Sequence, residues 1–319
     1  MVPLDGSPAA EHALPRAAAI AQRANACIRI VAVLPGAGFL EPEDLPSAVS
    51  ERLRRGKEQL SRYVDRVVAT LRATSHVRAT GSVRIDAPVD GLLKEMEDKT
   101  VDLVVMTSHG RGGLKRAWLG SVTDALLRRA AVPVLVVKPT SDSQPDWKRP
   151  GPALDSVVVP LDGSTVAEAA LEPAAALAEL YGASLILLQV VTTPYVVPPT
   201  AVPYGMVVDH IEVLDRRSRA EDYLQRVAER VRAEGLTATP IVIDQESIAE
   251  GIVAHSENGA ETVIALATHG IGGVKRLLLG SVADKVLRLA EAPVMVVRPE
   301  EAQPGDETTR HALHESVAG

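Results

Sequence analysis

The chain has 319 residues, which is enough for two ordinary domains at roughly 100 to 200 residues each. Hydrophobic residues make up 46% of the chain and charged residues 24%, which excludes a disordered protein, and no apolar run reaches the roughly 18 residues that span a bilayer. A net charge of -7 and an aromatic content of 3% argue against binding to nucleic acid. We therefore expect neither a nucleic-acid partner nor a membrane partner.

The cysteine content and the first residues indicate a compartment. Cys27 is the single cysteine, so an intramolecular disulfide is excluded, as is typical of a reducing environment. The first residues show neither the basic start nor the apolar stretch of a secretory leader. We expect a cytoplasmic protein in which Cys27 is a small buried hydrophobic residue.

The sequence contains an internal repeat. The motif LDGS occupies residues 4–7 and again 161–164, and nine of fifteen positions are identical between 107–121 and 267–281. Each half closes on a valine-rich run between two prolines. The segment between the halves is rich in Pro, Ser and Asp, as linkers are. The predicted organisation is a first domain over 1–139, a linker over 140–153, a second domain over 154–299 and a flexible tail over 300–319.

Strands and helices alternate in both halves, and the second half shows the order most clearly. Short valine-rich runs predict strands over 156–161, 185–191, 239–243, 262–267 and 294–297. Helical periodicity predicts helices over 164–181, 209–234, 248–258 and 281–290, while the prolines of 192–205 predict a loop. Five strands with helical crossovers predict a doubly wound α/β fold, a parallel sheet with helices on both faces.

The two repeated motifs follow strands one and four, at the sheet edge where such folds bind ligands. Glycines in the loops 110–120 and 270–280 allow positive φ and close approach to an anion. Ser121 and Ser281 are expected to cap the following helices, with Asp124 and Asp284 as capping-box partners. A phosphate is well accommodated at such a helix start, and basic pairs at 115–116 and 275–276 add positive charge. The alternative is a long turn with two ordinary caps.

These residues resemble the universal stress protein family in its tandem, two-domain form, through its signature Gly-x2-Gly-x9-Gly-Ser/Thr. The later positions match, and the first glycine is replaced in both halves. The resemblance implies Rossmann-like domains with strand order 3-2-1-4-5, similar to adenine-nucleotide α-hydrolases, and ATP as ligand, with or without Mg²⁺. It also implies contacts of an acid with the nucleoside and of a strand-two valine with adenine. The nucleotide-binding residues carried over are Asp5, Val33, Thr107, Gly110, Gly120 and Ser121, with Asp162, Val190, Ala267, Gly270, Gly280 and Ser281.

Several alternatives stay open at this stage. Asp5 and Asp162 also fit a role as helix-start caps, and His109 and His269 fit turn residues better than catalytic ones. We expect a non-catalytic regulator of the stress response that binds ATP and hydrolyses it very slowly at most, because no Walker A lysine loop or related nucleotidyl-transfer motif is present. The alternative function is a nucleotide-free signalling or scaffold module of the same fold.

The ends of the two domains lead to two further expectations. The last strands, 134–137 and 294–297, would be exposed apolar edges, and the resemblance to the family implies that such strands pair between domains. We therefore predict that they pair within the chain as an internal pseudo-dimer, with a homodimer left open. The first half has only four residues before Asp5, whereas six residues of strand one precede Asp162. We therefore expect Asp5 to be held less firmly and the second site to be the stronger one.

Overall fold

The computed structural model describes residues 1–36, 46–97, 101–108, 119–139, 145, 151–192, 210–257, 261–268 and 279–299, with residues 210–214 described by their backbone. Its first half contains β1 (Val2–Pro3), α1 (Pro8–Glu11), α2 (Ala13–Arg23), β2 (Cys27–Pro35), α3 (Ser47–Thr74), β3 (Arg78–Asp86), α4 (Pro88–Glu97), β4 (Val104–Thr107), α5 (Ser121–Arg129) and β5 (Val134–Val137). Its second half contains β6 (Ser156–Pro160), α6 (Thr165–Glu168), α7 (Leu171–Tyr181), β7 (Ser184–Val191), α8 (His210–Ala233), β8 (Ala238–Asp244), α9 (Ile248–Ser256), β9 (Thr262–Ala267), α10 (Ser281–Leu289) and β10 (Val294–Val297).

Both halves have the doubly wound α/β fold that the sequence predicts. In the second half the parallel strands lie in the order β8-β7-β6-β9-β10, which is the order 3-2-1-4-5. In the first half β3, β2 and β1 are parallel neighbours, as are β4 and β5. Met1 joins β1 to β4 through two hydrogen bonds. Its amino group donates to the Leu103 carbonyl at 2.7 Å, and its carbonyl accepts the N–H of Val105 at 2.9 Å. The first half therefore repeats the strand order of the second.

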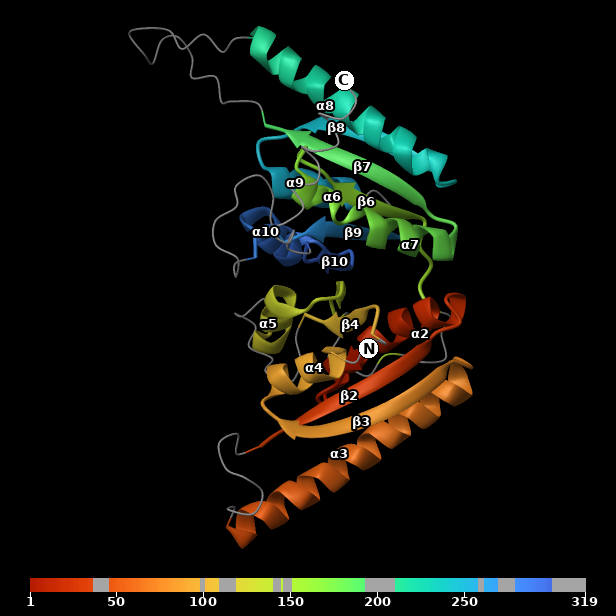
Figure 1. Ribbon diagram of the computed structural model, residues 1–319, viewed down its shortest axis with the longest axis vertical. Helices are drawn as coiled ribbons and strands as arrows, with labels where there is room; N and C mark the ends of the chain where they lie inside the picture. Colours follow the sequence, from red (N-terminus) through yellow and green to blue (C-terminus); the bar gives the residue numbers. More distant parts are fainter. Residues whose placement is uncertain are drawn as a thin grey trace, which may run out of the picture.

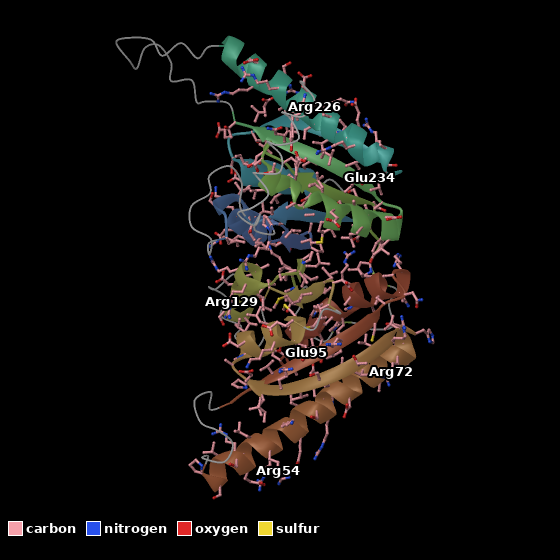
Figure 2. All side chains as sticks on the ribbon, viewed as in Figure 1. Arg54, Arg72, Glu95, Arg129, Arg226 and Glu234 are labelled. Carbon is pink, nitrogen blue, oxygen red and sulfur yellow. The ribbon has the colours of Figure 1, made fainter. Side chains whose placement is uncertain are left out.

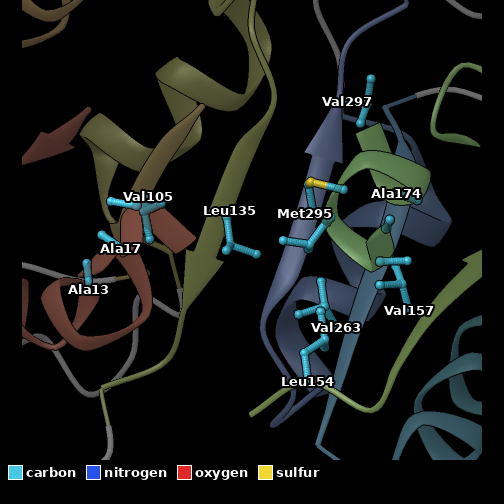
Figure 3. Close-up of a cluster of buried hydrophobic side chains, with 14 of the residues drawn as sticks. Ala13, Ala17, Val105, Leu135, Leu154, Val157, Ala174, Val263, Met295 and Val297 are labelled. Atoms are coloured by element: carbon cyan, nitrogen blue, oxygen red, sulfur yellow. The ribbon is translucent and has the colours of Figure 1, made fainter. Parts of the chain in front are cut away.

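The last strands of the two halves pair, as expected. β10 runs antiparallel to β5, with Met295 opposite Leu135, so the sheet of the second half continues into the first. Both side chains are at most 2% exposed, and Figure 3 shows them facing each other among the buried residues of the two halves. The chain is an internal pseudo-dimer because this pairing covers both apolar edges.

Helices cover the two faces of the sheets as two separate layers. One hydrophobic cluster contains side chains of α2, α3, α7 and α8, and the other contains side chains of α4, α5, α9 and α10. Both clusters include strand residues from the two halves. In Figure 1 the long helices α3 and α8 lie at opposite ends of the molecule, while α5 and α10 lie near its middle. The halves thus meet along β5, β10 and the helices beside them.

Three sequence expectations need correction. The helix predicted over 164–181 is broken into α6 and α7, because Pro173 has no N–H for the carbonyl of Ala169 and its ring crowds that carbonyl. Cys27 is exposed rather than buried, because it is the first residue of β2 and lies at the rim of the sheet. The expected looser hold on Asp5 is not seen, although β1 has two residues and β6 has five. The bonds of Met1 described above extend the short strand.

Candidate functional site

The two Asp-Gly-Ser loops have the same geometry. Oδ1 of Asp5 accepts bonds from the N–H of Ser7 at 2.9 Å and from its hydroxyl at 2.6 Å, and Asp162 does the same for Ser164 at 3.0 and 2.6 Å. Each serine hydroxyl then accepts the N–H three residues on, which caps α1 or α6. The predicted role in the turn and helix start is confirmed for both aspartates.

Strand register brings the two candidate valines to the same level as these aspartates. Pro3 lies opposite Val31 and Pro160 lies opposite Leu188, so two residues farther along Asp5 is level with Val33 and Asp162 with Val190. Both valines are half-buried. Because β4 and β9 are the other neighbours of β1 and β6, their carboxyl ends reach the same edge. The structure thus assembles acid, valine and loop start at one edge in each half.

The junction from strand four to the last helix is also duplicated. The N–H of Gly120 donates to the Ser108 carbonyl at 2.7 Å, and that of Gly280 to the Thr268 carbonyl at 2.6 Å. Each glycine carbonyl accepts the first helical bond, from Asp124 or Asp284, at 2.9 Å. The first N–H groups of α5 and α10 therefore have no acceptor within their own helix.

Two details of this junction differ from expectation. The N-cap residues are Gly120 and Gly280, whereas Ser121 and Ser281 are the first helical residues, with exposed side chains. Asp124 and Asp284 are not capping-box partners, because they form salt bridges with the arginines one turn farther along, at 2.8 and 2.9 Å. The capping glycines have φ of -66° and -59°, so positive φ is not the reason for glycine there. A glycine at this position still leaves the helix start without a side chain.

The first signature position distinguishes the two halves. Thr107 is buried, and its carbonyl accepts a hydrogen bond from the Thr123 hydroxyl at 3.1 Å. Ala267 is half-buried, and the residue equivalent to Thr123 is Ala283, which has no hydroxyl to donate. Neither Thr107 nor Ala267 is among the described residues with positive φ, so a side chain causes no backbone strain at this position. The replacement of the signature glycine is therefore sterically compatible with the fold.

The rest of the candidate loop lies outside the described residues. This applies to Gly110 and Gly270, to His109 and His269, and to the basic pairs at 115–116 and 275–276. The roles expected for these residues stay predictions.

A tyrosine–glutamate pair beneath each Asp-Gly-Ser loop was missed by the sequence analysis. The Tyr63 hydroxyl of α3 donates to Glu11 at 2.9 Å, and the Tyr223 hydroxyl of α8 donates to Glu168 at 2.9 Å. Burial is the largest cause that raises the pKa of Tyr63, and the negative charge of Glu11 is the next largest. Burial also raises the pKa of Tyr223 most, and the hydrogen bond to Glu168 comes second. Asp5 and Asp162 are close enough to add to these shifts. The signal in the sequence is the recurrence of both residue types in both halves.

Comparison with known proteins identifies the class that this fold defines. The sequence matches the Universal stress protein family over residues 1–138 and again over 154–298. The chain therefore belongs to this family, and it contains two tandem domains of it. Among the described residues, no helix is long and apolar enough to cross a membrane.

Individual relatives agree with this assignment. A universal stress protein of Mycobacterium tuberculosis is 31% identical over 197 residues, which is 62% of each chain, so that alignment spans less than two thirds of the relative. Another from the same organism is 25% identical over 316 residues, covering 93% of this chain and 94% of the relative. The crystal structure of a universal stress protein from Archaeoglobus fulgidus superposes with a TM-score of 0.59 at 19% identity, over 91% of this chain and 93% of that one, and this likeness concerns the fold alone.

Proposed function

We propose that each half binds one adenine nucleotide, ATP, and that occupancy of the two sites regulates the conformation or the partners of the protein in a stress response. The observation that supports this most is the duplicated junction between strand four and the last helix. Sequences elsewhere in the halves have diverged, yet the bonds at Gly120 and Gly280 agree within 0.1 Å. Binding of the same ligand in both halves would explain why the two junctions kept the same geometry, and they lie at the sheet edge where α/β folds bind ligands.

The residues at this edge have the chemistry for an adenine nucleotide. The N–H groups at the start of α5 or α10 suit the phosphates, since a helix start combines unpaired donors with the positive end of the helix dipole. The exposed hydroxyl of Ser121 or Ser281 adds a donor. The acid, Asp5 or Asp162, is placed for the nucleoside hydroxyls, and Val33 or Val190 offers backbone and an apolar side chain to the base.

Mg²⁺ is proposed as an ion that comes with the nucleotide rather than as a resident metal. Among the described residues, no three His, Cys, Asp or Glu side chains are grouped as a metal site. The carboxylates of Asp5 and Asp162 are hard oxygen ligands of the kind that Mg²⁺ prefers. We further propose that the protein holds ATP without enzymatic turnover, since its sequence has no motif that positions a nucleophile or a leaving group.

A nucleotide-free signalling or scaffold module is the second candidate. One observation favours it: Oδ1 of each aspartate is already bonded twice within its own turn, so the acids have a structural role without any ligand. In this case the junctions would be retained as structural turns.

The test is direct analysis of bound nucleotide. Denaturing the freshly purified protein and identifying the released small molecules should give adenine nucleotide in up to two equivalents per chain. Gly120→Val together with Gly280→Val adds a branched side chain at both proposed phosphate sites while keeping a φ that L-residues adopt readily, so ATP binding should be lost with an unchanged circular dichroism spectrum. Unchanged ATP affinity in this double variant would support the nucleotide-free candidate. ATP turnover above about 1 per second would contradict the non-catalytic assignment.

A further inference from the structure

The outer strands of the two halves differ in how their free edges are protected. These strands are β3 in the first half and β8 in the second, and Figure 1 shows them toward opposite ends of the molecule. Within the part of the chain that the structure describes, each pairs with one neighbouring strand only, β2 or β7. A free edge offers unpaired N–H and C=O groups to another strand, and natural proteins usually block it with proline, charge or short length.

Backbone hydrogen bonds show which residues of these two strands face outward. The Asp86 carbonyl in β3 accepts the N–H of Gly36, which follows β2, at 3.4 Å, so Asp86 faces β2. The Thr237 carbonyl, just before β8, accepts the N–H of Leu185 in β7 at 2.8 Å, so Thr237 faces β7. Successive strand residues turn their backbone groups to opposite sides. The outward residues are therefore Ala79, Gly81, Val83 and Ile85 in β3, and Ala238, Pro240, Val242 and Asp244 in β8.

An arginine blocks the start of both edges in the same way. Arg72 of α3 donates to the Ala79 carbonyl through Nε at 3.1 Å and Nη2 at 2.6 Å. Arg232 of α8 donates to the Ala238 carbonyl through the same two atoms at 3.0 and 2.7 Å. Figure 2 shows Arg72 on α3, beside β3. The two alanines are thus equivalent, and the residues after them can be compared position by position.

β8 has two further protective residues that β3 lacks. Pro240 lies on the outward side of β8 and has no N–H to donate, and Asp244 ends that side with a charge. The equivalent residues of β3 are Gly81 and Ile85, and Ile85 is 43% exposed. A Cβ at Gly81 would come 2.3 Å from Cγ1 of Val64, so α3 leaves no room for a proline there. Beyond its first residues, β3 is therefore an edge without the protection that β8 has.

We propose that two copies of the chain form a dimer in which β3 pairs antiparallel with β3. Ser82 is the midpoint of this nine-residue strand, so the register that pairs all nine residues places Ser82 on the two-fold axis. Gly81 of one copy then lies opposite Val83 of the other. Because both residues face outward, they exchange two hydrogen bonds. This pairing does not depend on the proposed nucleotide function.

The same register places opposite charges against each other at both ends of the paired strands. Arg78 of one copy lies directly opposite Asp86 of the other, and the two-fold axis repeats this contact. Asp86 forms a salt bridge with Lys94 of α4 at 2.6 Å, and Arg78 projects from the same face of the strand because it is an even number of residues away. A slip of two residues in either direction separates Arg78 from Asp86, and in one direction it places Arg78 opposite Arg84. The charges therefore favour the register centred on Ser82.

The apolar residues and the rest of the sheet agree with this arrangement. Ile85 of one copy lies opposite Ala79 of the other, so the pairing takes an exposed isoleucine out of water while Arg72 keeps the Ala79 carbonyl. The chain already contains one antiparallel pairing of this kind, between β5 and β10, with α5 and α10 near each other beside it. Because Pro240 and Asp244 protect β8, the assembly should end at two copies.

Sedimentation equilibrium of the intact chain tests the dimer. The unchanged protein should form a dimer that dissociates on dilution, with no larger species. Ile85→Asp gives β3 the residue type that β8 has at this position, and it should weaken the dimer at least about tenfold. Leu289→Asp is the matched control, because Leu289 of α10 is 45% exposed and lies away from β3, and it should leave the dimer unchanged. A monomeric unchanged protein, association beyond two copies, or equal dimerisation of the two variants would overturn the proposal.

A disulfide cross-link tests the register. In a Cys27→Ser background, Ser82→Cys is the single cysteine, and the pairing brings its two Cα atoms to about 4.5 Å, which a disulfide can span. Mild oxidation should therefore give a covalent dimer on a non-reducing gel. Thr80→Cys in the same background is the matched control, because Thr80 lies opposite Arg84 and its two copies are roughly 13 Å apart along the strands. Cross-linking that is absent at Ser82→Cys, or as efficient at Thr80→Cys, would overturn the register.

Discussion

The two tyrosine–glutamate pairs allow a matched comparison of single substitutions, because they make the same bond at different burial. Glu11 is 2% exposed, so Tyr63→Phe removes a hydrogen bond from an almost fully buried carboxylate. The side chain of Glu168 is 24% exposed, so water can replace the lost bond after Tyr223→Phe. We expect Tyr63→Phe to lower the free energy of unfolding by about 2 kcal/mol and Tyr223→Phe by about 1 kcal/mol or less. Urea unfolding of both variants measures the difference, and equal losses would contradict it.

The same tyrosines predict how stability depends on alkaline pH. Burial, and then the neighbouring glutamate, raises the pKa of Tyr63 in the folded chain, and Tyr223 shifts in the same direction. In the unfolded chain a tyrosine ionises near pH ~10. Above that pH the unfolded state has lost protons that the folded state keeps, so the contribution to stability is complete below about pH 10 and falls as the pH rises further.

The measurement compares unfolding midpoints on either side of that pH. The urea midpoint of the unchanged protein should fall between about pH 9.5 and pH 11, and that of the double variant Tyr63→Phe with Tyr223→Phe should fall less. All other side chains are the same in both proteins, so the double variant serves as the control for their contribution. Identical pH profiles would show that the two phenols do not contribute.

At the scale of elements, the ends of α2 and α7 offer another matched pair. Gly182 ends α7 with φ of +65°, and Asn25, at the corresponding place after α2, has φ of 49°. A Cβ at Gly182 would meet no atom within 4 Å, so any cost of substitution comes from the backbone conformation. Gly182→Ala should therefore destabilise the protein by about 1 kcal/mol, and Gly182→Asn by less, since asparagine tolerates the left-handed region. Thermal unfolding of the two variants checks the order.

The success of sequence analysis varied with the range of the interactions involved. The alternation of strands and helices could be predicted from apolar runs and handed crossovers, whereas the strand order and the pairing of β5 with β10 were implied by the family resemblance. The N-cap at Gly120 could not be predicted, since the serine that follows the glycine fits the N-cap pattern and placed the expected cap one residue too late. The break before Pro173 was readable in principle and was outweighed by the alanine-rich periodicity. The Tyr63–Glu11 bond joins residues far apart in the sequence, and only the fold brings them together.

At the scale of the whole molecule, the two halves are held together by the sheet and by contacts at its rim. Arg16 of α2 is 5% exposed, and its Nη1 donates to the Ala153 carbonyl at 2.9 Å, just before β6. Burial lowers the pKa of this guanidinium, with Tyr181 of α7 and Glu261 opposing the shift. Pro173 stands at the place of Arg16 in the second half, so this contact has no symmetric counterpart. The pairing of β5 and β10, in contrast, is nearly symmetric.

That near-symmetry leads to a prediction about residues 154–299 alone. Without the first half, β10 would leave Val294, Met295 and Val296 at an open apolar edge, although each is at most 3% exposed in the intact chain. A second copy can cover this edge, because Met295 would then face Met295 as it now faces Leu135. The isolated half should therefore form a dimer, measurable by analytical ultracentrifugation. Met295→Lys places a charge at the centre of that pairing and should give a monomer with the same circular dichroism. A folded isolated half that stays monomeric without this substitution would show that the pairing of β5 and β10 depends on the covalent linker and on contacts such as that of Arg16.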